Sequence, residues 1–180
     1  MKEKIHVIIE WLEAVLIAVV IAVVIENLLF SFAVVNGQSM APTLDSEDRL
    51  LIGKAPFIYH RLNIGDLVIF NPPDQSNQDE IFIKRVIAKE SDHFYIEDGI
   101  LYINGERKVE NYIFEEEYLK RNYQLLEGVV PPDAVFVMGD NRNDSNDSRT
   151  FGFVPKDKIK GKVLFKVWPL DEVKAFISSK

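Results

Sequence analysis

Lys84 is the residue of this sequence whose surroundings most clearly favour chemistry. It lies in the stretch IFIKRVIA, residues 81–88, where alternation along a strand places Phe82 and Val86 on the same face as Lys84. Burial among apolar neighbours disfavours the ammonium form, and the shifts documented for buried lysines can bring the pKa from about 10.4 toward about 7. A neutral amine can act as a general base, whereas the alternative interpretation is a lysine whose amine reaches solvent at the sheet edge.

Other common catalytic groups are missing or poorly placed. The chain has no cysteine, which excludes thiol catalysis, a cysteine zinc site and disulfides. Its three histidines, His6, His60 and His93, lack the carboxylate pattern of a Ser/His/Asp arrangement. No HExxH motif occurs, and residues 140–149 lack the glycine and terminal glutamate of a calcium-binding loop. No metal and no cofactor are therefore expected.

A serine-containing turn, NGQSMAPTL at residues 36–44, directly follows the apolar N-terminal segment. Gly37 permits an unusual backbone conformation beside Ser39, and Pro42 fixes how the chain leaves the turn. Three further segments follow in order, IGDLVIF at 64–70, KRVI at 84–87 and GDNRNDSNDSR at 139–149. Together, over residues 36–152, they resemble the type I signal peptidases, whose signature Ser-Met-x-Pro-Thr follows a transmembrane helix.

The resemblance implies a Ser/Lys dyad that needs no histidine. Ser39 would be the nucleophile, and Lys84 would be the general base that takes its proton. The Ser145 hydroxyl would hydrogen-bond and orient the Lys84 amine. The oxyanion hole would use the backbone N–H of Ser39. Some family members add a serine hydroxyl two positions before the nucleophile, but this chain has Gly37 there, as in the Gram-positive branch.

Charged residues of the same segments are expected to shape the site rather than to attack the substrate. By the resemblance, Asp147 and Arg149 match a supporting ion pair, and Asp140 pairs with Arg85. Isolated surface pairs contribute little to stability, but a network can align a site.

The implied substrates are secretory preproteins with Ala-x-Ala-like cleavage sites. Small side chains at the first and third positions before the cut would enter shallow apolar pockets, which exclude larger side chains by volume. An extended substrate would pair its backbone with edge strands near Ser39 and Lys84. The residues expected to contact the substrate are Val35, Gly37, Met40, Leu44, Phe82 and Ile83.

The elements that must position these residues are mostly short strands. Runs such as RLLIGK, HFYIE, ILYING, AVFVMGD and GKVLFKVW are separated by Gly, Pro, Asn and Asp, which predicts a mainly β protein. Asp98-Gly99 joins two alternating runs and predicts a type I′ hairpin. We also expect a polar loop over 71–79, a brief helix over 115–126 and a small helix over 171–178. The resemblance implies the signal-peptidase or LexA-like fold of antiparallel sheets.

One segment departs from the family pattern. Members commonly follow the Lys-Arg segment with a Gly-x-Pro-Gly-Asp turn, whereas this chain has Ala88-Lys89-Glu90-Ser91-Asp92. The stretch after this turn is short compared with the larger members, which implies little or no second domain.

The N-terminal segment predicts a membrane anchor. AVLIAVVIAVVI is unbroken from 14 to 25, and after Glu26 and Asn27 the apolar character resumes, so that residues 14–35 approach the length of a bilayer span. Lys2 and Lys4 favour a cytoplasmic N-terminus, and the Glu26 carboxylate is expected near the outer interface. The expected organisation is a short cytoplasmic N-terminus at 1–13, a transmembrane anchor at 14–35 and an extracytoplasmic catalytic domain at 36–180.

These expectations place the protein at the plasma membrane, with one pass and with lipid and preproteins as its partners. A net charge of −7 argues against nucleic acid, whose phosphates require a basic surface. Two alternatives stay open at this point. One is a self-cleaving Ser/Lys protease like LexA or UmuD, and the other is an inactive membrane-anchored scaffold that keeps the fold.

Overall fold

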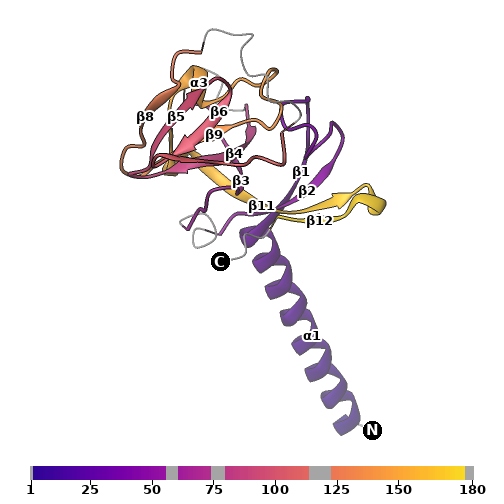
Figure 1. Ribbon diagram of the computed structural model, residues 1–180. Coiled ribbons are helices and arrows are strands. Elements are labelled where there is room, and N and C mark those ends of the chain that lie inside the picture. Colours follow the sequence, from indigo (N-terminus) through magenta and orange to yellow (C-terminus); the bar gives the residue numbers. More distant parts are fainter. Residues whose placement is uncertain (1, 56–60, 74–79, 114–122, 177–180) are drawn as a thin grey trace.

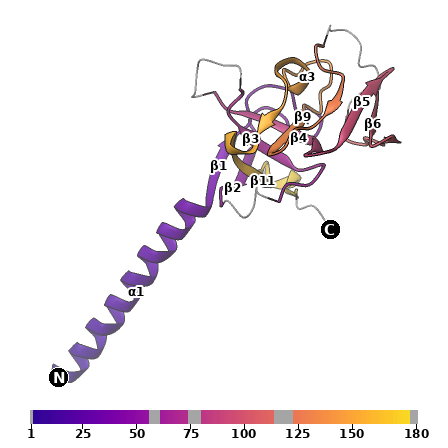
Figure 2. The ribbon, with the colours of Figure 1, turned by 90° about the vertical axis from the view of Figure 1, so that its left-hand side faces the viewer.

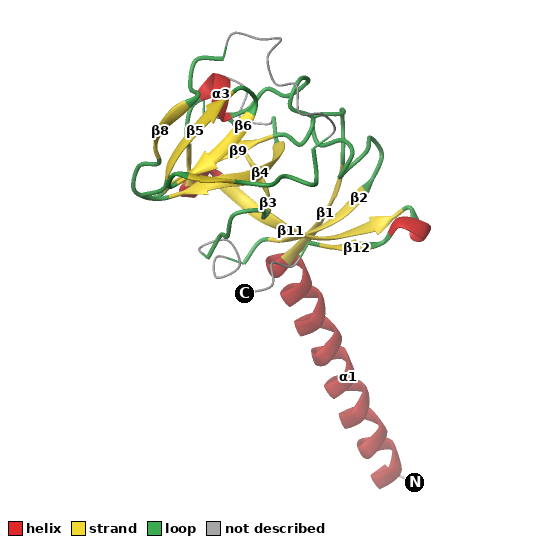
Figure 3. Ribbon diagram, viewed as in Figure 1, coloured by secondary structure: helices red, strands yellow, loops and turns green. Residues whose placement is uncertain are grey.

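One long helix and two antiparallel sheets make up the protein (Figures 1 and 3). The computed structural model describes residues 2–55, 61–73, 80–113 and 123–176, with side chains from residue 9 onward except at 26 and 27. The elements are α1 (Lys2–Leu29), β1 (Phe30–Val34), β2 (Arg49–Gly53), β3 (Leu67–Phe70), β4 (Phe82–Lys89), β5 (His93–Glu97), β6 (Ile100–Ile103), β7 (Glu106–Arg107), β8 (Glu127–Val129), β9 (Ala134–Met138), α3 (Ser148–Phe151), β10 (Val154–Pro155), the 3₁₀ turn η1 (Lys156–Lys158), β11 (Ile159–Trp168), the 3₁₀ turn η2 (Leu170–Glu172) and β12 (Lys174–Ala175).

Helix α1 projects from the sheets as a separate rod and runs directly into β1 (Figure 2). The predicted anchor extended to residue 35, but the helix ends at Leu29 because residues Phe30–Val34 pair with β2. Aromatic and β-branched side chains at Phe30, Phe32 and Val34 favour this strand. Among the described residues, no helix combines the length and the apolar character required for a transmembrane span. The side chains of Lys2, Lys4 and Glu26 lie outside the described part.

The larger sheet carries the residues of interest. Its strand order is β1-β2-β11-β3-β4-β9-β10, and β12 pairs with β11. Strand β11, the longest described, pairs with both β2 and β3. Gly161 lets it approach β2 closely, since a Cβ at Gly161 would stand 2.6 Å from the carbonyl oxygen of Gly53. Apolar clusters cover both faces of this sheet, which explains why strands β3 and β9 are buried throughout rather than alternating.

The smaller sheet has the order β7-β6-β5-β8 and packs against the end of the larger one. Phe94 of β5 stacks on Phe136 of β9 with ring centroids 4.0 Å apart, in a cluster that contains buried residues of both sheets. The smaller sheet therefore shares a core with the larger one.

The predicted hairpin is confirmed. Asp98 and Gly99 both have positive φ, 48° and 78°, and Glu97 pairs with Ile100. The predicted helix over 171–178 is wrong, because η2 covers Leu170–Glu172 and β12 adds a short strand to β11. Most of the predicted helix over 115–126 and the tip of the loop over 71–79 lie outside the described residues, as does His60.

Candidate active site

Ser39 lies in the turn that follows β1, residues 36–44. Gly37 has a φ of 97°, which lets the chain reverse direction there at no steric cost. The Leu44 N–H donates to the Met40 carbonyl at 3.0 Å, and both side chains are buried in the apolar cluster beneath the turn. The turn is thus anchored from below, and the half-buried Ser39 is held at the surface of the sheet.

Lys84 reaches this turn from the middle of the larger sheet. It pairs with Val68 of β3 on one side, while the pairing of β4 with β9 begins only at Arg85. The free side of β4 at Lys84 leaves room for the Ser39 turn. The Lys84 Nζ lies 2.7 Å from the Ser39 Oγ, and only 4% of Lys84 is exposed.

The surroundings of Lys84 favour its neutral form. Burial lowers the pKa of Lys84 to about 8, and the positive charge of Arg149 acts in the same direction. The Asp147 and Asp140 carboxylates oppose this shift without cancelling it. An appreciable fraction of the amine is therefore neutral near pH 8, and a neutral amine at this distance can accept the proton of the Ser39 hydroxyl.

Arg85, the next residue of β4, joins four segments that are far apart in sequence. Its guanidinium forms a two-bond pair with Asp140, at 2.8 and 2.5 Å. The same group donates to the Gly65 carbonyl at 2.8 Å and to the Thr43 hydroxyl at 3.3 Å. Arg85 thus ties the Ser39 turn, the start of β3 and the loop after β9 to the strand that carries Lys84.

The loop at residues 139–149, which we call the 139–149 loop, contains the second predicted ion pair. The Arg149 guanidinium donates twice to the Asp147 carboxylate, at 2.8 Å in each contact, and both side chains are fully buried. Burial alone raises the pKa of Asp147, but Arg149, the Ser145 hydroxyl and the Gly139 N–H outweigh it, so that the pKa lies below its ordinary value. Asp147 also caps helix α3 by accepting from the Arg149 N–H.

Ser145 lies behind the dyad but does not bond to it. Its hydroxyl is buried and lacks a hydrogen-bond partner among the described residues, although it lies near enough to Asp147 to lower the pKa of that carboxyl. The expected hydrogen bond from Ser145 to the Lys84 amine is therefore not formed. The amine instead points to the Ser39 Oγ.

A cavity of about 260 Å³ opens beside Ser39, between β1 and the start of β4. Three of the predicted substrate contacts, Val35, Met40 and Ile83, line it. Ser39 lines it as well. The remaining lining residues were not predicted to contact substrate; they are Ser31, Phe32, Ala33, Val34, Asn36, Ile69 and Ile81. Among the described residues, strand β1 pairs only with β2, and its other backbone edge runs along this cavity.

The other predicted substrate contacts lie elsewhere. Leu44 is fully buried in the core, because it anchors the turn from below. Phe82 packs against Phe70 and Phe151, with ring centroids 6.2 and 6.3 Å apart, and its ring centre lies 5.1 Å from the Lys84 Nζ, but it does not line the cavity. Gly37 is exposed and does not line the cavity.

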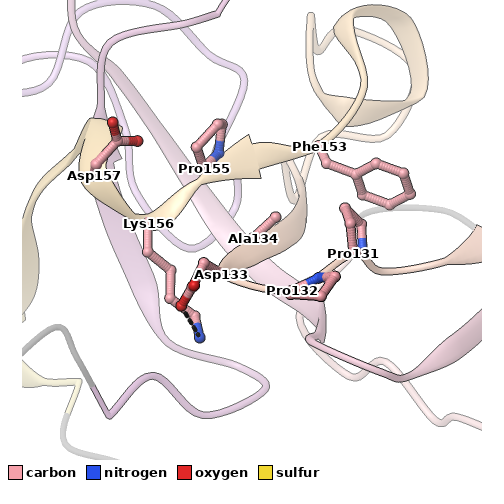
Figure 4. Close-up of a pocket in the computed structure, with 8 residues that line it drawn as sticks. All are labelled: Pro131, Pro132, Asp133, Ala134, Phe153, Pro155, Lys156 and Asp157. Carbon is pink, nitrogen blue, oxygen red and sulfur yellow. Dashed lines mark ion pairs between the residues drawn. The ribbon is translucent and has the colours of Figure 1, made fainter.

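A larger cavity, of about 590 Å³, lies away from the dyad (Figure 4). Its walls are mainly Pro131, Pro132, Phe153 and Pro155, and Lys156 at its rim faces Asp133. The lining contains no hydroxyl, so it offers no counterpart to the Ser39 nucleophile.

Several residues that contact the charged pairs were missed from sequence. Three of them, Glu110, Tyr112 and Tyr123, lie between β7 and β8. Glu110 pairs with Arg142, the Tyr112 ring lies against Arg85 and its hydroxyl donates to Glu110, and the Tyr123 hydroxyl donates to the Arg142 carbonyl. Arg142 lies within the 139–149 loop but was given no role. No local pattern marks these residues, because their partners are distant in sequence.

Comparisons with known proteins found relatives over most of the chain. A family model described as "Signal peptidase, peptidase S26" matches residues 8–168. A probable signal peptidase I-1 from Synechocystis sp. is 36% identical over 159 residues, 86% of this chain and 79% of that protein. A signal peptidase I from Bacillus caldolyticus is 36% identical over 166 residues, 87% of this chain and 89% of that protein. A crystal structure of a signal peptidase I from Enterococcus faecalis is 28% identical, with a TM-score of 0.46 over 57% of this chain and 96% of that chain.

Proposed function

Since the chain belongs to the signal peptidase family, peptidase S26, it is a serine endopeptidase that removes signal peptides, and we propose that Ser39 and Lys84 form its catalytic dyad. The observation that carries this proposal is the 2.7 Å contact between the Ser39 Oγ and the buried Lys84 Nζ. No other hydroxyl among the described residues lies against an amine whose pKa is lowered.

The reaction proceeds through an acyl-enzyme. Neutral Lys84 takes the Ser39 proton as the Oγ attacks the scissile carbonyl carbon, and the backbone N–H of Ser39 stabilises the oxyanion. The Lys84 ammonium then gives its proton to the leaving amine, which frees the mature protein. Lys84, neutral again, deprotonates a water that attacks the ester, and the signal peptide leaves with a new carboxylate while Ser39 regains its proton.

The substrate is an extended segment of a secretory preprotein. It lies in the 260 Å³ cavity beside Ser39, where the free edge of β1 can pair with its backbone. Val35, Met40 and Ile83 make the cavity wall near Ser39 apolar. The small volume of the cavity favours substrates with Ala-x-Ala-like cleavage sites.

A membrane anchor brings enzyme and substrate together. We place the part of α1 from residue 14 to Leu29 in the plasma membrane, as a single pass, with 1–13 in the cytoplasm and the catalytic domain, from β1 onward, on the outer side. Many apolar side chains of α1, among them Trp11, Leu16 and Ile21, are more than half exposed, which supports contact with lipid. Anchoring raises the effective concentration of a membrane-held preprotein at the dyad.

Cleavage of a purified preprotein by the detergent-solubilised full chain tests this proposal. The native chain is expected to release the signal peptide, and Ser39→Ala and Lys84→Met are each expected to abolish release. The matched controls are Ser46→Ala and Lys89→Met, at exposed positions, which are expected to cleave like the native chain. Retained cleavage in either dyad variant contradicts the assignment, and a native chain that cuts only itself indicates a self-cleaving protease instead.

A further inference from the structure

Glu110 lies in the segment that follows β7 and is buried against the 139–149 loop. Its carboxylate pairs with both terminal nitrogens of Arg142, one at 2.8 Å and the other closer still. The same carboxylate accepts the Tyr112 hydroxyl at 2.6 Å. The side chains of Glu110 and Arg142 are 5% and 1% exposed, so this pair is shielded from solvent, unlike most ion pairs between a loop and its neighbour.

Tyr112 lies between two arginines of the site. The guanidinium carbon of Arg85 is 4.0 Å from the centre of its ring, and that of Arg142 is 5.9 Å away. Burial raises the pKa of Tyr112, and the Glu110 carboxylate adds to this effect, so that the hydroxyl stays protonated and keeps donating to Glu110. The Tyr112 ring thus covers the Arg85 guanidinium. Its hydroxyl fixes the Glu110 carboxylate, which pairs with Arg142.

Arg142 in turn holds the 139–149 loop in shape. Its Nε donates to the Gly139 carbonyl at 3.1 Å, and its own carbonyl accepts from Arg149 at 2.8 Å. Tyr123 donates to the same carbonyl, also at 2.8 Å. Arg149 pairs with Asp147, so a series of contacts leads from Glu110 to the Asp147 carboxylate, and the charge of that carboxylate acts on Lys84.

We propose that Glu110 and Tyr112 are positioning residues, which clamp Arg142 and Arg85 and thereby keep the 139–149 loop closed over Lys84. This inference rests on the proposed function of the dyad. Loss of the Glu110 charge leaves the buried Arg142 charge without the carboxylate that balances it, so the loop loosens and water reaches the Lys84 amine. The charged groups that face Lys84 are Asp140, Asp147 and Arg149, all from this loop, so their displacement and the entry of water change its protonation together.

The test compares Glu110→Gln and Tyr112→Phe with the native chain in preprotein cleavage, and titrates the Lys84 side chain by NMR. The control is Glu106→Gln, in β7 just before this segment. The Glu106 carboxylate also pairs with a cation, Lys108 at 2.8 Å, but its side chain is 77% exposed. Thermal melting of each variant gives the folded fraction.

Glu110→Gln is expected to lower kcat by about 10- to 100-fold with KM within about twofold, as for a misplaced catalytic group. The midpoint of the pH profile and the Lys84 titration should both move to higher pH. Tyr112→Phe should do the same to a smaller extent, and Glu106→Gln should change neither. If Glu110→Gln does not fold, the pH profile and the Lys84 titration of Tyr112→Phe test the inference in its place.

The inference is overturned if the activity of the variants falls only in proportion to their folded fraction, while the midpoints of the pH profile and of the Lys84 titration stay unchanged. Should the native chain cleave no preprotein, the proposed function fails separately, and the NMR titration still decides: a Lys84 midpoint that rises in Glu110→Gln supports the clamp, and an unchanged midpoint overturns it.

Discussion

The carbonyl oxygen of Ser39 lies so close to Gly139 that a Cβ atom at residue 139 would stand 2.4 Å from it. The same atom would stand 2.3 Å from the Ser145 Oγ. The backbone of the 139–149 loop therefore lies directly against the Ser39 turn, and the Asn141 N–H completes the contact by donating to the Ser39 carbonyl at 3.1 Å. The position of the nucleophile depends on the absence of a side chain in a loop one hundred residues away.

Gly139→Ala is expected to displace the Ser39 turn and to lower kcat/KM for preprotein cleavage by about 100-fold, because a shift of about 1 Å at the reacting atoms has that effect. Gly128→Ala is the matched control. A Cβ at Gly128 would meet its nearest atoms at 3.6 Å, an ordinary contact, so cleavage should stay near the native rate. Equal rates for the two variants would contradict the close packing of the loop on the turn.

Lys84→Met should be more stable than the native chain at neutral pH, although it is inactive. The folded pKa of about 8 lies below the ordinary 10.5, so burial of the ammonium costs the native fold about 3 kcal/mol below pH 8. This cost decreases between pH 8 and 10.5, as the unfolded chain binds the proton that the folded chain lacks, and it is gone above that range.

Urea unfolding at pH 6 and at pH 10.5 measures this effect. The stability gain of Lys84→Met is expected to be large at pH 6 and to vanish at pH 10.5. Lys89→Met, at an exposed position, should show no such change with pH. A Lys84→Met gain that is the same at both pH values would mean that the amine is not desolvated in the folded protein.

Ala33→Leu should narrow the specificity of cleavage. Ala33 lines the cavity beside Ser39 together with Val35, and a longer side chain there reduces the space for substrate. We expect kcat/KM to fall by about 10- to 200-fold for a substrate with valine three residues before the cut, and less for one with alanine. Val109→Leu, at a residue that is 79% exposed, serves as the control. An unchanged preference would place the substrate outside this cavity.

The parts of the fold that follow local rules were predictable from sequence. The Asp98-Gly99 turn specifies its hairpin because two adjacent residues with positive φ suit one turn type. The burial of Lys84 was predicted from its apolar strand neighbours, although β4 is buried on both faces, and the pairing of Arg85 with Asp140 was predicted from the resemblance of two segments.

The parts that depend on distant contacts were not predictable. Residues Phe30–Val34 continue an apolar helical run, and only their pairing with β2 makes them a strand. Glu110 and Arg142 are 32 residues apart, and nothing in either local sequence marks them as partners. Phe82 shares a strand face with Lys84, as predicted, and its ring centre lies 5.1 Å from the amine, but it packs on Phe70 and Phe151 and does not line the cavity.

Titration of the Lys84 amine, by NMR of the side-chain carbon next to the nitrogen in the native full chain, tests the central claim most directly. The predicted midpoint is about 8, and the pH dependence of kcat/KM should rise with the same midpoint as the amine loses its proton. A Lys84 that titrates near 10.5, or a kcat/KM that does not follow its titration, would contradict the claim that a buried, neutral lysine activates Ser39.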